Sequence, residues 1–349
     1  MTTTEQQAHK KVVSHNTTMA TWAGAIARAL RTYAVDDKRV FADAGIDHAL
    51  VNNPAQRIPV ADMTRLWNLS VAESGDPAFG LAVAKQVNLT TFHALGVAAI
   101  ASATVREAGD MICRFASMIS DGIAMRLHQQ DNEIGLVLGM QPSYPRFADG
   151  CVEAALASVY RVTRQLVPDA KVTRLTFQHA GPADAGVYQR FFDCTVTFSA
   201  AQDGIYTAMN SVVSTPLPSS SPQLARANAA LCEDYLSSRQ SQVSARVRDL
   251  IVQKIQQGTL PSLPDIASDL AMSERKLQRL LRDEGIQFRD LLDDVRALLA
   301  KQLLSNDSLS VGRVAEQLGF DSMSSFSRAC RRWHGVTPRA LRQSDQRLT

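Results

Sequence analysis

The sequence predicts an α+β N-terminal domain of helices and an antiparallel sheet, followed by an all-α domain of two helix-turn-helix units joined by a long helix. Three observations predict this architecture. The spacing of apolar residues changes from a helical to an alternating period near residue 123. One pattern occurs twice between residues 266 and 342, which indicates a repeated supersecondary unit. A Pro- and Ser-rich stretch separates the two regions, and 349 residues exceed one ordinary domain.

The N-terminal half has helical periodicity after a polar start. Residues 1–16 contain no apolar run of the kind a signal peptide needs, so we expect a short disordered tail there. The first domain is expected to span 17–213. Apolar residues at helical spacing predict helices over 18–33, 60–74 and 151–166 and two more within 92–119.

Alternating or continuous apolar runs predict the strands of the sheet. Residues 123–128 and 134–140 flank Gln130, Asp131 and Asn132, which is typical of a β-hairpin. Further strands are expected at 172–179, 196–199 and 205–208. The helices should then cover one side of an antiparallel sheet.

A linker is expected between the domains. Residues 214–224 are rich in Pro and Ser, 225–236 have a helical pattern, and 237–242 are polar, so the linker with its helix is placed at 214–242. The second domain is expected to span 243–345, and its first helix 243–257 faces inward with Val247, Ile251 and Ile255.

The repeated pattern predicts two helix-turn-helix units, at about 262–285 and 310–335, with a long helix over 288–304 between them. In the first unit Ser262 can cap the opening helix, and Ser273 can cap the second after a turn at Ala271 and Met272. In the second unit Gly319 permits the turn.

The outward faces of the two second helices are the candidate DNA-binding sites. In the first unit Leu277, Leu280 and Leu281 recur at inward spacing, so the polar residues between them face out. Arg suits guanine and Gln suits adenine in the major groove, and either can hold phosphate. The alternative is a solvated helix face with no partner. The candidates of the first unit are Ser273, Glu274, Arg275, Gln278, Arg279 and Arg282.

In the second unit Phe326 and Ala329 face inward. Small hydroxyls on the outer face suit close backbone approach or phosphate contact. Arg331 and Arg332 either hold phosphate or lie favourably at the negative helix end. The candidates of this unit are Ser322, Met323, Ser324, Ser325, Ser327, Arg328 and Arg331.

The C-terminal region resembles the DNA-binding domain of the AraC/XylS family of bacterial transcription regulators. The residues that carry the resemblance are Gly319, Phe320, Phe326, Ser327, Arg328, Arg331, Arg332, Trp333, Gly335, Thr337, Pro338 and Arg342. Two departures occur. Ala271 replaces the commoner Gly, at little cost if its φ stays below zero, and Cys330 stands where the family usually has Phe.

The N-terminal region resembles the effector domain of the AraC-family branch with an arabinose-binding-like domain, similar to ornithine utilisation regulators. The resemblance rests on 92–115 and on a run of aromatic residues before the Leu217-Pro218 pair. These aromatics either line an effector pocket or pack the core, and the effector-binding residues stay unassigned. The run comprises Phe177, Tyr188, Phe191, Phe192 and Phe198.

The resemblance implies a cytoplasmic, sequence-specific DNA-binding transcription regulator that acts as an effector-responsive activator of a metabolic operon. Its expected partners are double-stranded DNA, a small-molecule effector such as an amino acid, amine or carboxylate, RNA polymerase and a second copy of the chain. The alternative is a constitutive DNA-binding regulator whose N-terminal domain mediates only protein contacts.

Other classes have little support in the sequence. No HExxH, GxSxG, P-loop or GxGxxG motif occurs, so no enzyme and no catalytic residue is expected. Five scattered cysteines without CxxC spacing predict neither disulfides nor zinc, and no metal or other cofactor is expected. No apolar run is long enough for a membrane helix. The net charge of +3 is too small to indicate nucleic acid by itself, so the motif carries that prediction.

Overall fold

The computed structural model describes residues 16–53, 56–88, 91–140, 144, 146–209, 216–240, 243–305 and 309–346. The described chain forms two compact units. The N-terminal unit comprises Asn16–Gln141 and Arg146–Leu236, and the C-terminal unit is built on Ser237–Thr349. Of the tail expected at 1–16, residues 1–15 lie outside the described part. Asn16 is buried, and its backbone oxygen accepts a hydrogen bond from Val60 N at 2.7 Å.

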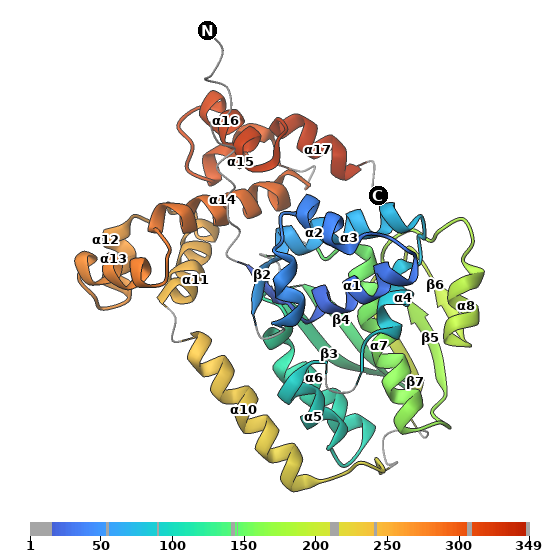
Figure 1. The fold of residues 1–349 in the computed structure, drawn as a ribbon. Coiled ribbons are helices and arrows are strands. Elements are labelled where there is room, and N and C mark those ends of the chain that lie inside the picture. The colour runs from blue at the N-terminus through green and yellow to red at the C-terminus, as the bar shows by residue number, and fades with distance from the viewer. Residues whose placement is uncertain are drawn as a thin grey trace. The chain divides into compact units, whose positions relative to one another are not determined.

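A five-stranded sheet lies at the centre of the N-terminal unit, in the order β3-β4-β7-β5-β6 (Figure 1). Three of its four pairings are antiparallel, as expected, and β5–β6 is parallel. Parallel neighbours need a crossover connection, and a helix between β5 and β6, α8 (Gly186–Phe192), supplies it. The strands are β3 (Ile123–Gln130), β4 (Glu133–Met140), β5 (Val172–Thr176), β6 (Thr195–Thr197) and β7 (Asp203–Ala208).

Helices occur wherever long apolar periodicity predicts them. They are α1 (Thr21–Thr32), α3 (Val60–Ser74), α5 (His93–Ile100), α6 (Val105–Ile119) and α7 (Asp149–Leu166). The unpredicted elements are all short, and two helical turns give too few residues to establish a period. These are α2 (Asp37–Ala44), α4 (Phe79–Lys85), α8, the 3-10 helix η1 (His48–Asn52) and the ribbon of β1 (Thr17–Met19) with β2 (Arg57–Pro59).

Helices α4 and α7 cross closely, and a glycine permits the approach. A Cβ at Gly80 would lie 2.6 Å from the Gly150 oxygen and 2.7 Å from Glu153 Oε2. Real Cβ atoms do not approach so closely, so only glycine fits there. This crossing buries Glu153 against α4, with 2% of its surface exposed.

The helix α10 (Pro222–Gln240) contains the helix expected at 225–236 within the linker region 214–242 and extends beyond it at both ends. Cys232 of α10 is fully buried in the core formed by α1 and α3, and Tyr235 and Leu236 pack against the same core. Arg114 of α6 also forms an ion pair with Glu233. The first compact unit accordingly extends through Leu236.

The C-terminal unit contains seven helices within its described residues, around one core. The long helix α14 lies between the two helix-turn-helix units and buries Leu291, Val295 and Leu299 (Figure 1). The first helix and the last helix flank these units, and the last was not predicted. The helices are α11 (Val243–Gln256), α12 (Leu263–Asp269), α13 (Glu274–Asp283), α14 (Phe288–Leu304), α15 (Val311–Gln317), α16 (Met323–His334) and α17 (Pro338–Gln346).

Polar side chains join these helices where their backbone groups would otherwise be unpaired. Arg296 of α14 donates to the Gly319 oxygen at 3.2 Å, and its guanidinium lies 5.0 Å from the Phe320 ring centre. Arg342 donates to the Leu304 oxygen at 2.9 Å and to the Leu309 oxygen at 2.5 Å. These bonds connect α14 to the turn of the second unit and to α17.

Candidate DNA-binding interface and ligand cavity

The first helix-turn-helix unit is fixed at both of its helix starts. Ser262 and Asp265 form a reciprocal capping box at α12, and the Ser273 hydroxyl accepts from Lys276 N at 3.3 Å at α13. Leu277 and Leu281 are buried at one turn's spacing. These contacts decide which face of α13 remains outside.

The outward face of α13 carries Arg275, Gln278, Arg279 and Arg282, while Ser273 caps the helix and Glu274 begins it. At 3.6 residues per turn, Arg275, Arg279 and Arg282 lie within about 60° of one another around the helix. In the described part of the chain none of the three has an ion-pair partner. Lys276, which was not among the expected contacts, is exposed too. The exposed candidates are Ser273, Glu274, Arg275, Gln278, Arg279 and Arg282.

The helix α16 repeats this geometry 49 residues later. Ser322 caps it by accepting from Ser325 N at 3.2 Å, and Phe326 and Cys330 are fully buried. Cys330 thus fills the core position where the related family usually has Phe. The outward positions Arg275, Gln278, Arg279 and Arg282 of α13 correspond in register to Ser324, Ser327, Arg328 and Arg331 of α16.

Not every candidate of the second unit faces out. Ser322, Met323, Ser324, Arg328 and Arg331 are exposed, whereas Ser325 and Ser327 are half-buried. The Ser325 hydroxyl lies 3.0 Å from the Ser322 hydroxyl and accepts from Arg328 at 3.4 Å. Arg332 forms an ion pair with Asp293 at 2.8 Å. Ser325 and Arg332 therefore help to hold the unit together.

The turn of the first unit does not meet the condition under which Ala271 would cost little, a φ below zero. Its φ is 52°, in the left-handed region. Gly319 occupies the matching turn of the second unit with a φ of 73°. The two turns have the same backbone, and only one of them has the residue that prefers it.

The N-terminal unit contains a partly open cavity of about 210 Å³ between the sheet and helices α5, α6 and α7. Its walls are almost entirely apolar and include Leu95, Ile112, Leu136, Leu138, Val159 and Ile205. Arg106, which is exposed, is the one charged residue among the described lining residues. The volume far exceeds the roughly 10–15 Å³ that one water needs.

The aromatic residues singled out in the sequence do not line this cavity. They pack against one another, with the Phe177 and Phe198 rings stacked at 5.4 Å and the Phe191 and Phe192 rings edge to face at 4.9 Å. The core interpretation therefore applies to the run 177–198. Its polar member, Tyr188, donates from its hydroxyl to Glu153 at 2.6 Å. The cavity could not be recognised in the sequence because its wall is assembled from many elements.

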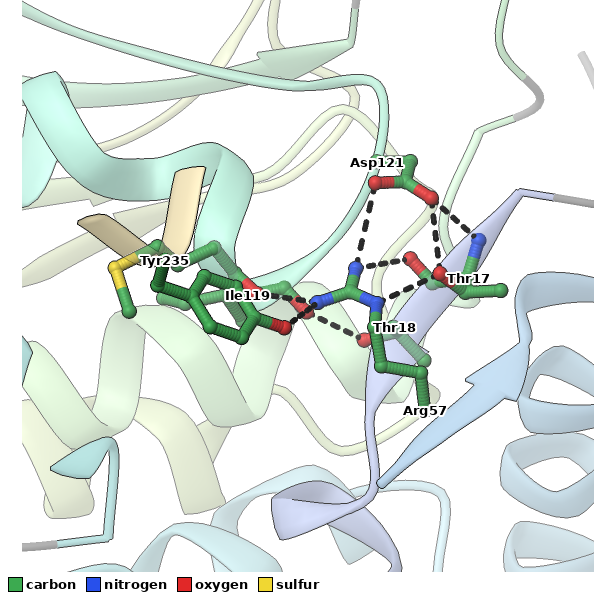
Figure 2. Close-up of polar contacts among 7 residues, drawn as sticks. Thr17, Thr18, Arg57, Ile119, Asp121 and Tyr235 are labelled. Carbon is green, nitrogen blue, oxygen red and sulfur yellow. Dashed lines mark hydrogen bonds and ion pairs between the residues drawn. The ribbon is translucent and has the colours of Figure 1, made fainter. Parts of the chain in front are cut away.

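One end of the cavity lies beside a network centred on Arg57. The Arg57 guanidinium donates to the Met118 oxygen at 2.6 Å, to the Thr17 oxygen at 2.7 Å and to the Tyr235 hydroxyl at 3.2 Å, and it pairs with Asp121 (Figure 2). Met118 directly precedes Ile119 and Ser120, which line the cavity. The network thus connects the cavity wall to α10.

Other site classes find no support in the part of the chain that is described. No group of three or more His, Cys, Asp or Glu side chains there could hold a metal ion. All five cysteines are free. None of the described helices has the length and apolar character to cross a membrane.

Two capped helix-turn-helix units with basic outer faces, braced by one long helix, define a DNA-binding transcription regulator. Comparison with known proteins identifies its family. Residues 35–210 match the arabinose-binding domain of AraC transcription regulators, and residues 266–344 match a helix-turn-helix domain. The chain belongs to the AraC family.

Several relatives are similar over most of their length. The chain is 27% identical over 329 residues to the ornithine utilization regulator of Pseudomonas aeruginosa, covering 93% of this chain and 95% of that one. It is 28% identical over 287 residues to the regulator VirS of Mycobacterium tuberculosis, covering 81% and 84%. The crystal structure of CdpR from Pseudomonas aeruginosa is 24% identical and covers 90% of this chain and 97% of that one, with a TM-score of 0.44.

Proposed function

We propose that this AraC-family regulator is an effector-responsive activator that reads an asymmetric DNA site with α13 and α16. The two helices would enter successive major grooves, roughly 34 Å apart. Their outer faces differ, since Arg275 and Gln278 of the first correspond to Ser324 and Ser327 of the second. The first helix would therefore supply most of the base contacts, and the second more of the phosphate contacts.

The observation that carries this proposal is the unpaired arginine face of α13. Arg313 of the C-terminal unit, in contrast, pairs with Glu316 at 2.7 Å. Arg275, Arg279 and Arg282 share one face, and no ion pair within the described residues occupies them. Their five-donor guanidinium groups remain available for base edges and phosphates.

The DNA-binding test uses a duplex that the full-length protein selects from random sequence. Arg279→Ala is expected to weaken binding to this duplex by about 1–3 kcal/mol and to leave binding to random DNA nearly unchanged. Arg190→Ala is the matched control, because it removes the same charge from an exposed site on α8 of the other unit. Equal affinity of both variants for the selected duplex would contradict base reading by α13.

The effector-responsive part of the proposal rests on the cavity. A regulator whose N-terminal domain mediated only protein contacts would need no apolar cavity of about 210 Å³. The relatives' names point the same way, because one refers to ornithine utilization and the family description to arabinose. Effector binding would shift the population of DNA-binding arrangements in a homodimer and so the recruitment of RNA polymerase.

Activation itself is tested with a promoter reporter. In a strain that lacks the protein, expression from a promoter with a mapped binding site should fall. It should be restored by the wild-type gene and not by the Arg279→Ala gene. Raised expression in the deletion strain would instead indicate a repressor.

A further inference from the structure

The chemistry of the cavity wall restricts what can bind there. A sugar or an α-amino acid carries several hydroxyl or charged groups, and each needs a partner when it leaves water. The described wall offers few polar side chains, and its charged residue, Arg106, is exposed. No carboxylate belongs to it to neutralise an ammonium group. Hydrocarbon, in contrast, is stabilised by every apolar residue of this wall.

One buried polar atom in the wall points to the second feature of the ligand. Ser120 is 2% exposed and lines the cavity, and its hydroxyl has no hydrogen-bond partner in the described structure. Buried hydroxyls are nearly always hydrogen-bonded, so an unpaired one on a residue that borders a cavity is free to turn towards a ligand oxygen there. A hydroxyl can donate to or accept from an oxygen of the ligand.

We propose that the cavity binds a molecule with a hydrocarbon body and a single oxygen-bearing head group, the head bonded to Ser120. This rests on the proposed function in one respect, that occupancy of the cavity is the signal sent to the DNA-binding unit. The ligand class excludes sugars and zwitterionic amino acids. It retains alcohols and carboxylic acids that bind in their protonated form, with a chain or ring of several carbons.

The site is also placed to affect α10. Ile119 lines the cavity beside Ser120, and its oxygen accepts from the Thr18 hydroxyl at 3.1 Å. The preceding oxygen, of Met118, is held by Arg57, which in turn donates to Tyr235 of α10 (Figure 2). A head group bonded to Ser120 would shift the backbone of residues 118–120. Through Arg57 and Tyr235 the shift would be transmitted to α10, the helix that leads into the DNA-binding unit.

A chain-length series tests the ligand class on the full-length protein without DNA. Calorimetric titration with primary alcohols and carboxylic acids of about six to twelve carbons should show affinity rising about fourfold per added methylene, until the cavity is full. The two series reveal which head Ser120 prefers. L-ornithine and L-arabinose should give no binding. Affinity that does not depend on chain length, or tighter binding of either polar probe, overturns the proposal.

Two variants locate the binding. Ala108→Leu fills the cavity from α6 while keeping a good helix former, and it should weaken the longest ligand at least tenfold. Ser120→Ala should weaken every ligand about five- to tenfold and leave the unfolding temperature of the free protein unchanged or higher, because its hydroxyl has no partner to lose. A lowered unfolding temperature with unchanged affinity would assign Ser120 a structural role instead.

The matched control is Ser70→Ala in α3. Ser70 is equally buried, lies outside the cavity and donates to the Leu66 oxygen at 2.7 Å. This variant should lower the unfolding temperature and leave ligand affinity within twofold.

The signal is tested separately with Tyr235→Phe, which removes the hydroxyl that Arg57 reaches. This variant should bind the ligand as the wild type does, and the ligand should no longer change its affinity for the selected duplex. If wild-type protein binds the chain-length series but its DNA affinity never responds, the ligand class stands and the proposed effector response fails.

Discussion

Ala271 adopts a backbone conformation that its residue type does not predict. An L-residue in the left-handed region costs roughly 1–2 kcal/mol, and helices that end this way usually have glycine at that position. Ala271 is exposed, and its N–H donates to the Ser268 oxygen at 2.9 Å, which closes the turn. Capping of both flanking helices and the burial of Leu277 therefore hold this turn in place against its local preference.

Ala271→Gly is expected to stabilise the C-terminal unit by about 0.5–1 kcal/mol, since the relieved strain exceeds the added entropy of the unfolded chain. Gly319→Ala is the reciprocal change, and its Cβ would also lie 2.8 Å from a Leu260 methyl group. It should destabilise the unit by about 1–2 kcal/mol. Denaturant unfolding of the full-length protein measures both. Equal destabilisation by the two changes would mean that the two turns do not share a backbone.

At the scale of elements, the sequence predicts what is long and periodic. Residues 60–74 and 288–304 each offer four or more turns of repeated apolar spacing, and α3 and α14 occupy them. The outward face of α13 was likewise predictable, because the spacing of Leu277 and Leu281 shows which face of the helix is buried. Contacts at a distance were not. Only the folded chain shows that Cys232 of α10 is buried in the core, or that the wall of the cavity comes from the sheet and three helices.

One such distant contact caps an element. The Glu284 carboxylate, just beyond α13, accepts from Val243 N at 2.7 Å and from Ser244 N at 3.1 Å at the start of α11. It satisfies two N–H groups that a helix start leaves unpaired, and its charge opposes the positive helix end. Through this contact the first helix-turn-helix unit and α11 stabilise each other.

Glu284→Gln should lower the free energy of unfolding by about 1 kcal/mol, because it removes the charge from a helix cap. Glu316→Gln is the control in the same unit. Its carboxylate pairs with Arg313 on the surface, and such exposed pairs contribute about 0–1 kcal/mol. Urea unfolding at low and at high salt compares them. A Glu284→Gln protein as stable as the control would show that the charge of this cap contributes nothing.

At the scale of the whole molecule, the two units have separate cores, so a change buried in one should leave the other alone. Glu153 offers such a change. Burial raises the pKa of its carboxyl to about 8, against the opposing hydrogen bond from Tyr188, and the nearby carboxylates of Asp149 and Asp76 raise it further. His179 lies 3.4 Å from the same carboxyl.

The direction of the pH effect follows from that pKa. In the unfolded chain a glutamate loses its proton near pH 4.5, whereas folded Glu153 keeps it to about pH 8, so folding takes up a proton between these values. The stability that Glu153 contributes is therefore fully present below about pH 4.5 and is lost as the pH rises towards 8. The amide of a Glu153→Gln variant does not titrate in this range. The free energy of unfolding of the variant, relative to that of wild type, should therefore rise between pH 5 and 8 by an amount on the order of 3 kcal/mol.

Calorimetric scans at several pH values measure this, and Glu133→Gln is the control in the same unit. The Thr173 hydroxyl and Arg174 lower the pKa of the Glu133 carboxyl, so its stabilising effect is lost only as the pH falls, and its difference from wild type should stay constant above pH 5. The effect of Glu153→Gln should appear only in the transition of the N-terminal unit. Parallel curves for this variant and wild type would show that Glu153 is ionised in the fold. A shift in both transitions would show that the stabilities of the two units are coupled, in which case a ligand in the cavity would stabilise the DNA-binding helices as well.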